Sequence, residues 1–237
     1  MHAMVVSLKD LFEQNANPGQ AGPMAAYMRN QFAYLGIKSP QVAALHKKFY
    51  AEHGYPKTID LDPILRELWA LPQREFQYAG LTLLGRFEKR LPAEFIDILE
   101  YLLVTKSWWD TVDSIAAGVV GTHFRRYPEV RMDSLAHWRN SQNLWLRRTT
   151  ILFQLKYKKN TDFPLLCEII IENLGSKEFF INKAIGWALR QYSRVDERAV
   201  RDFVADTRLH PLSAREALKW LEHERSPGRQ NKDHSLL

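Results

Sequence analysis

The chain has 237 residues, of which 46% are hydrophobic and 25% are charged, as in ordinary folded proteins. This composition excludes a disordered or fibrous chain, and no apolar run reaches the roughly 18–20 residues that a membrane-spanning helix needs. The formal net charge of +6 favours a polyanionic partner. The first residues lack the basic and apolar regions of a signal peptide, so we expect a cytoplasmic protein with no membrane partner.

The predicted elements along the chain are all helices. Proline and glycine fall at break points, and the segments between them, mostly about 10–20 residues long, repeat their apolar residues with a 3.6-residue period. Four helix starts carry a capping side chain, at Ser39, Asp62, Ser176 and Asp196. No strand alternation or hairpin signal is present. The sequence predicts an all-α protein of about a dozen helices over residues 1–225, then a flexible polar tail over residues 226–237.

Aromatic residues mark an internal repeat. Similar segments begin at Phe76, Trp109, Trp145 and Phe180, and these anchors are 33, 36 and 35 residues apart. Two helices per period of this length indicate stacked helical pairs, as in HEAT-like solenoids. We therefore expect one continuous curved solenoid domain. The alternative is a chance alignment, since any amphipathic helix offers an aromatic residue.

One repeat differs from the others four residues after its anchor. Three repeats carry a small residue there, Gly80, Thr149 or Ala184, whereas the fourth carries Asp113. The i, i+4 spacing puts Asp113 beside Trp109 on one helix face. This carboxylate next to an indole is a candidate reactive group. The alternative is an acidic residue that only favours the positive end of the helix dipole.

Other familiar chemistries lack their motifs. The one cysteine, Cys167, excludes an internal disulfide and a CxxC pair, and its apolar surroundings indicate a core residue. The eight histidines are scattered and form no HExxH or similar metal motif. Glycine-rich phosphate loops and a GxSxG elbow are also missing. We therefore expect no metal and no cofactor.

Basic residues concentrate in the second half of the chain. Residues 141–220 hold fourteen Lys and Arg against nine Asp and Glu, a net charge of +5. Helical periodicity places cations and tryptophans together on three faces. The first face holds Trp145, Arg148, Leu152, Lys156 and Lys159, the second holds Lys183, Trp187 and Arg190, and the third holds Lys106, Trp109 and Asp113.

This mixture of cations and flat rings fits a nucleic-acid groove. Lys and Arg bind phosphates, and aromatic rings pack on sugars or bases. The alternative is a solvated basic face with the tryptophans in the core. We favour DNA or RNA binding because three successive repeats show the same mixture.

Several long stretches closely resemble the AlkD family of bacterial alkylpurine DNA glycosylases. The resemblance runs from about residue 5 to residue 222, and its motifs are long and specific. The matching stretches are residues 23–40, 64–80, 103–118 (LVTKSWWDTVDSIAAG), 143–158 (NLWLRRTTILFQLKYK) and 176–192 (SKEFFINKAIGWALRQY).

The resemblance implies a solenoid of HEAT-like repeats that excises cationic lesions, such as N7-methylguanine and N3-methyladenine, without flipping the base. It implies that Asp113 is the catalytic aspartate and that Trp109 and Trp187 flank the deoxyribose of the lesion. Arg148 is expected to hold the DNA backbone near the lesion, and Tyr27 to contact the DNA. We expect further backbone contacts from the cations of the three faces, Lys106, Lys156, Lys159, Lys183 and Arg190.

This activity needs only one carboxylate. A base alkylated at N7 or N3 is already cationic and leaves without protonation, unlike the leaving group of a sugar glycosidase. We therefore expect a monofunctional hydrolase that acts on double-stranded DNA with alkylated bases, works as a monomer and joins the nucleoid when bound. The alternatives are a non-catalytic HEAT-like protein that binds damaged or branched DNA, and a protein-binding adaptor.

Overall fold

The computed structural model describes residues 1–224, so the tail predicted over residues 226–237 lies outside the described residues. The prediction of an all-α protein is confirmed. Over the described range, extended backbone pairs only in an isolated bridge between Ala33 and Gln73. No helix in that range is long and apolar enough to cross a membrane.

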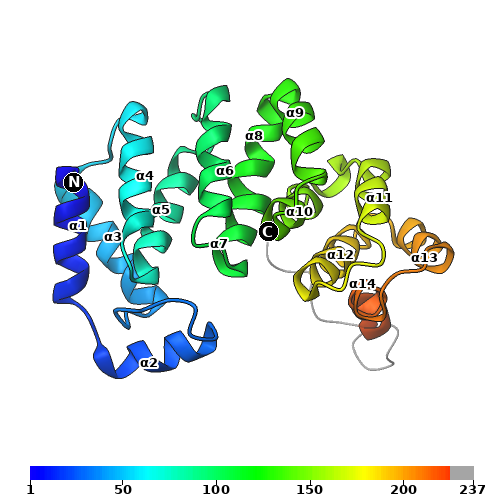
Figure 1. Cartoon of the computed structure of the whole chain (residues 1–237), viewed down its shortest axis with the longest axis horizontal. Coiled ribbons are helices and arrows are strands. Elements are labelled where there is room, and N and C mark those ends of the chain that lie inside the picture. Colours follow the sequence, from blue (N-terminus) through cyan, green and yellow to red (C-terminus); the bar gives the residue numbers. More distant parts are fainter. Residues whose placement is uncertain (225–237) are drawn as a thin grey trace. The chain divides into compact units, whose positions relative to one another are not determined.

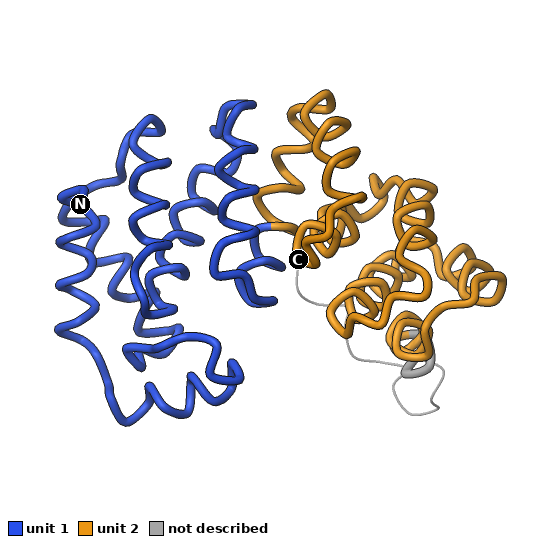
Figure 2. Tube along the Cα trace, viewed as in Figure 1, with its two compact units in different colours: residues 1–115 blue, residues 116–237 orange. Residues whose placement is uncertain are grey.

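The chain divides into two compact units, residues 1–115 and 116–237 (Figure 2). Each is described below by itself, and a single continuous solenoid stays a prediction. The elements of the first unit are α1 (Ala3–Gln14), α2 (Pro18–Tyr27), α3 (Ser39–His53), the 3-10 turn η1 (Thr58–Asp60), α4 (Leu61–Ala70), α5 (Arg74–Phe87), the 3-10 turn η2 (Ala93–Phe95), α6 (Ile96–Val104) and α7 (Trp109–Ser114).

The helices of the first unit stack as pairs (Figure 1). Helix α4 contacts α1, α5 and α6, while α1 also contacts α3, and α5 contacts α7. Trp69 of α4 lies against Gly80 of α5, and the Phe76 ring of α5 stacks on Phe12 of α1 with centroids 5.8 Å apart. Trp69 and Phe76 are completely buried. Burial of apolar faces against neighbouring helices therefore holds this unit together.

The second unit also pairs successive helices. Helix α12 contacts α10, α13 and α14, and α10 contacts α9 and α11. A π-helical segment, η3, directly follows α7 and leads into this unit. The elements from there on are η3 (Ile115–Val120), α8 (Gly121–Arg126), α9 (Pro128–Arg139), α10 (Leu144–Leu152), the 3-10 turn η4 (Lys158–Asn160), α11 (Phe163–Glu172), α12 (Phe179–Tyr192), α13 (Glu197–Asp206) and α14 (Pro211–Glu224).

The four aromatic anchors occupy equivalent places in the structure. Each lies within the first three residues of its helix, α5, α7, α10 or α12. Four residues later, Gly80, Thr149 and Ala184 are buried, whereas Asp113 is half-buried. The predicted difference at this position of the repeat is therefore present in the burial pattern.

Two of the three predicted faces are wrong in part. Helix α10 ends at Leu152, so Lys156 lies in a turn and Lys159 in η4 rather than on the face of Trp145. The helix ends because the Gln154 side chain bonds both the N–H and the C=O of Asp162. In addition, the Tyr157 hydroxyl donates to the Gly121 carbonyl at 2.6 Å.

The third predicted face, that of Lys106, Trp109 and Asp113, does not include Lys106 in the structure. Lys106 precedes α7 and has a left-handed backbone with φ of 48°, so it does not continue the face of Trp109 and Asp113. The α12 face of Lys183 and Trp187 is helical throughout, as predicted.

The predicted caps are confirmed only at Asp196, whose carboxylate accepts the Ala199 N–H at 2.8 Å. Helix α3 begins at Ser39 itself, and α12 begins three residues after Ser176. Asp62 lies inside the first turn of α4, where it pairs with Arg66. The N-cap positions of these helices differ from the predicted ones, so a polar residue near a proline is a weak guide to the cap position.

The cysteine predicted to lie in the core is half-buried. Cys167 is in the middle of α11, among apolar residues. Burial raises the pKa of the Cys167 thiol to about 11. The thiol is therefore protonated at neutral pH.

A buried histidine makes the first unit sensitive to acid. The ring of His46 lies 5.3 Å from that of Phe12 and 6.0 Å from that of Tyr50, and burial lowers the pKa of His46 to about 4. Below pH ~6.5 the His46 imidazole is therefore protonated in the unfolded chain but still neutral in the native state. The free energy of unfolding falls as the pH drops toward ~4.

We predict that His46→Phe removes this acid sensitivity. The wild type should lose about 3 kcal/mol of unfolding free energy between pH ~7 and ~4 through this residue, whereas the variant should lose correspondingly less. Urea titrations at several pH values measure the difference. The exposed His53→Gln is the control, and equal acid sensitivity of wild type and His46→Phe would contradict the assignment.

Candidate functional site

The first unit brings three of the predicted site residues together. Helix α7 begins at Trp109, and Asp113 lies one turn later on the same half-buried face. Tyr27, at the end of α2, is 73% exposed, and its ring meets that of Trp109 edge-on, with centroids 6.3 Å apart. The result is an accessible aromatic surface beside a carboxylate.

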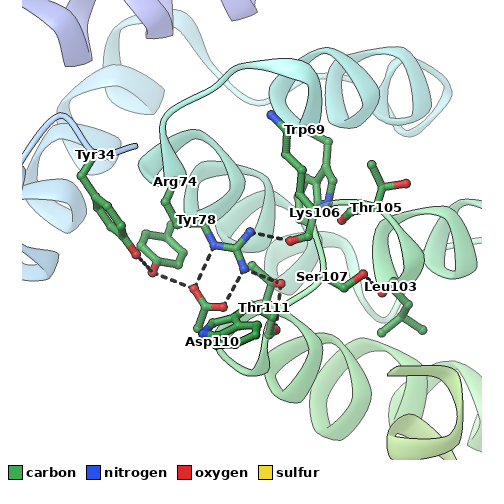
Figure 3. A network of polar contacts seen from close by, with 11 residues as sticks. Tyr34, Trp69, Arg74, Tyr78, Leu103, Thr105, Lys106, Ser107, Asp110 and Thr111 are labelled. Atoms are coloured by element: carbon green, nitrogen blue, oxygen red, sulfur yellow. Dashed lines mark hydrogen bonds and ion pairs between the residues drawn. The ribbon is translucent and has the colours of Figure 1, made fainter. Parts of the chain in front are cut away.

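A buried guanidinium fixes the start of α7 (Figure 3). Arg74 is completely buried and donates from Nε and Nη2 to the two carboxylate oxygens of Asp110, at 2.9 and 2.6 Å. It also donates to the Lys106 carbonyl at 2.8 Å and to the Thr111 hydroxyl at 2.9 Å. A bidentate pair of this kind fixes the orientation of the guanidinium relative to the carboxylate. It therefore sets the position of the turn that carries Trp109.

Two tyrosines complete this network. Tyr78 donates its hydroxyl proton to Asp110 Oδ2 at 2.8 Å, and the Tyr34 hydroxyl lies 3.1 Å from that of Tyr78 (Figure 3). Burial raises the pKa of Tyr34 to about 12, and burial together with the Asp110 charge raises the pKa of Tyr78. Both phenols therefore remain protonated, so that Tyr78 keeps its role as a donor to Asp110.

Lys106 has a structural role in this arrangement. Its ammonium donates to the carbonyls of Ala70 and Leu71 at the end of α4, at 3.0 and 2.5 Å. Burial, with a contribution from Arg74, lowers the pKa of Lys106. Two of its three donors are occupied by these carbonyls, and contact of Lys106 with DNA stays a prediction.

The loop after Tyr27 is held by a buried carboxylate. Glu75 accepts the N–H groups of Leu35, Gly36 and Ile37 at distances of 3.0, 2.9 and 3.2 Å. Gly36 has φ of 86°, and a Cβ atom there would lie 2.0 Å from the Asn17 carbonyl oxygen. This position therefore requires glycine.

In the second unit, Arg148 links two helices. Its side chain on α10 is only 4% exposed and donates to the Phe180 carbonyl at the start of α12. The guanidinium also lies over the Phe180 ring, 5.8 Å from its centroid. Arg148 therefore positions the helix that carries the half-buried Trp187.

The cations on either side of Trp187 share one acidic partner. Glu216 of α14 lies 3.0 Å from the Lys183 ammonium and accepts from Arg190 Nη1 at 2.8 Å. The two cations hold the pKa of Glu216 below its ordinary value. Lys183 and Arg190 are thus neutralised in part by the protein itself.

Lys156 and Lys159 are exposed to solvent. No described acidic side chain pairs with either ammonium. The Lys156 ammonium lies beside Gly118 of η3, where a Cβ atom would come within 3.9 Å of it. Of the predicted cations in the second unit, these two are the most exposed.

A protein-family model described as "DNA alkylation repair enzyme" matches residues 8–221. The chain belongs to this family.

A solved structure supports the same family. The structure, titled "Predicted DNA alkylation repair enzyme from Enterococcus faecalis", superposes with a TM-score of 0.80 at 33% sequence identity. The match covers 87% of this chain and 96% of that chain. Curated proteins gave no match to the sequence.

Several residues that hold the site of this DNA alkylation repair family member were missed in the sequence. Arg74, Glu75 and Asp110 look like exposed helix charges, because their buried partners lie 32 to 40 residues away. The sequence signal that points to Asp110 is its position directly after Trp109. Here the charge beside Trp109 has a distant partner of opposite sign, Arg74.

We predict that Asp110→Asn strongly destabilises the first unit. The substitution leaves the Arg74 charge buried without its counter-ion, which should cost about 3–5 kcal/mol of unfolding free energy. Tyr78→Phe, which removes one hydrogen bond to the same carboxylate, should cost only about 1 kcal/mol. Urea unfolding monitored by tryptophan fluorescence measures both values.

The matched control is Glu172→Gln, which breaks an exposed pair with Arg139. It should change stability by less than about 1 kcal/mol. A cost for Asp110→Asn as small as that of the control would show that the Arg74 network does not hold α7.

Proposed function

We propose that this DNA alkylation repair family member is a monofunctional DNA glycosylase. It hydrolyses the N-glycosidic bond of cationic alkylated purines, N7-methylguanine and N3-methyladenine, in double-stranded DNA and leaves an abasic site. The observation that carries the proposal is the half-buried Asp113, one turn from Trp109, at the repeat position that is otherwise small and buried.

The chemistry follows from the charge of the lesion. Cleavage of the bond to a cationic base releases a neutral base and develops an oxocarbenium-like cation on the sugar. An ionised Asp113 stabilises that cation and orients or deprotonates the attacking water. The water adds to C1′, and no general acid is required. The bond breaks without base flipping, so the site needs no pocket for an extruded base.

Aromatic rings assist the same step. The Trp109 face offers cation–π attraction of about 0.5–2 kcal/mol to the developing positive charge, and we assign the same role to Trp187. Tyr27 meets Trp109 edge-on and extends the aromatic surface that we assign to DNA contact. These contacts strengthen as the sugar becomes cationic, which is what lowers a barrier.

Hydrolysis by water is favoured over a Schiff-base mechanism. Lys106, three residues before Trp109, has its ammonium engaged with the end of α4. We assign no Schiff-base step to Lys106, and the proposed product is an abasic site that is released uncut. We propose that the protein is a cytoplasmic monomer that joins the nucleoid when it binds DNA.

The DNA backbone is held mainly by exposed cations. Lys156 and Lys159 neutralise phosphates, and Arg148 supports binding through the placement of α12 in addition to any backbone contact of its own. Because Arg148 is buried, its substitution would disturb packing, and the exposed lysines give the cleaner test of binding.

We predict that Asp113→Asn lowers the single-turnover rate of N7-methylguanine release at least about 100-fold, because it removes a charge that acts in the transition state. Affinity for the same duplex should change little. Asp133→Asn, which removes an exposed carboxylate from α9, is the control. Near-normal excision by Asp113→Asn would contradict the catalytic role of Asp113. Absence of excision by the wild type would favour a non-catalytic DNA-binding protein.

We predict that Lys156→Gln weakens binding to damaged and undamaged duplex alike. Loss of one phosphate contact should reduce the slope of log affinity against log salt by about 0.9. Binding isotherms at several salt concentrations measure the slope, with the exposed Lys57→Gln as control. An unchanged slope would remove Lys156 from the DNA-binding surface.

A further inference from the structure

The Glu216 carboxylate pairs with the two cations on either side of Trp187. Lys183 and Arg190 lie one turn before and one turn after Trp187 on α12, and their side chains are 37% and 28% exposed. Glu216, which pairs with both, is only 13% exposed. The two cations therefore reach solvent, while the charge that holds them is largely covered.

The backbone of Glu216 is seated firmly against α12. A Cβ atom at Gly186 would lie 2.5 Å from the Cβ of Glu216 and 2.9 Å from the Ser213 carbonyl, so α14 packs directly on a helix position without a side chain. The Ser213 hydroxyl also donates to the Asn182 carbonyl at 2.9 Å. Glu216 thus spans Lys183 and Arg190 from a fixed place.

A DNA phosphate and this carboxylate compete for the same donors. Lys183 and Arg190 have N–H groups that bind either kind of oxyanion by charge-assisted hydrogen bonds. A phosphate that approaches Trp187 must share or displace Glu216. The face of α12 therefore attracts DNA less than its two cations alone would, in contrast to the exposed Lys156 and Lys159.

We propose that Glu216 is a positioning residue that restrains phosphate binding at the Trp187 face by occupying Lys183 and Arg190, so that undamaged DNA is held less tightly there. The inference rests on the proposed function, in which that face meets the DNA. Undamaged duplex is the partner that this restraint meets most often, because it far outnumbers lesions and binds through its phosphates alone.

The test is Glu216→Gln, which keeps the size of the side chain and removes its charge. The variant should bind undamaged duplex more tightly than the wild type, with a salt slope steeper by up to about 1.8, the value for two added phosphate contacts. Its affinity advantage should shrink roughly tenfold when salt is raised from about 50 to about 200 mM.

Two further variants make the result specific. Lys183→Gln and Arg190→Gln, added together to Glu216→Gln, should abolish the gain, since no cation is left to release. Glu172→Gln removes the same charge from the exposed pair with Arg139 and should not steepen the salt slope. Glu216→Asp, whose shorter side chain cannot span both cations, should move affinity in the same direction by a smaller amount, and it replaces Glu216→Gln if that variant does not fold.

The outcomes separate the inference from the proposed function. Unchanged or weaker binding of undamaged DNA by Glu216→Gln with normal thermal melting would overturn the inference and leave Glu216 a packing residue. A gain that persists without the two cations would overturn it as well. Failure of the proposed function would appear separately, as no base release by the wild type, because the affinity measurements use undamaged duplex.

Discussion

The ion pair between Arg74 and Asp110 is the constraint on which the part of the candidate site in residues 1–115 depends. A completely buried guanidinium has to find acceptors for its donors, and here it finds them in Asp110, Thr111 and the Lys106 carbonyl. All of these lie at the start of α7. The same interaction that satisfies a buried charge therefore fixes the turn that presents Trp109 and, one turn on, Asp113.

The helical fold and the repeat were readable from the sequence because both are local patterns. Apolar periodicity gave the all-α class, and the aromatic anchors fall at the starts of α5, α7, α10 and α12. The contrast between Asp113 and its buried counterparts followed from that register alone. These features depend on residues within one or two turns of each other, which is the range over which a single sequence is informative.

The parts that were wrong depend on distant partners. Helix α10 ends because Gln154 bonds the backbone of Asp162 and Tyr157 reaches Gly121, and no periodicity within residues 143–159 reveals these contacts. Lys183 and Arg190 looked like free cations because Glu216 lies 33 and 26 residues further along the chain. Charge can be counted in a sequence, but whether it is available to a ligand is decided by tertiary pairing.

The protonation state of Cys167 has a consequence for the reactivity of its sulfur. Agents that alkylate purines also attack sulfur, and the reactive form of cysteine is the thiolate. Burial in α11 keeps this thiol protonated well above neutral pH. Cys167 therefore stays in its thiol form, which reacts with electrophiles more slowly than a thiolate does.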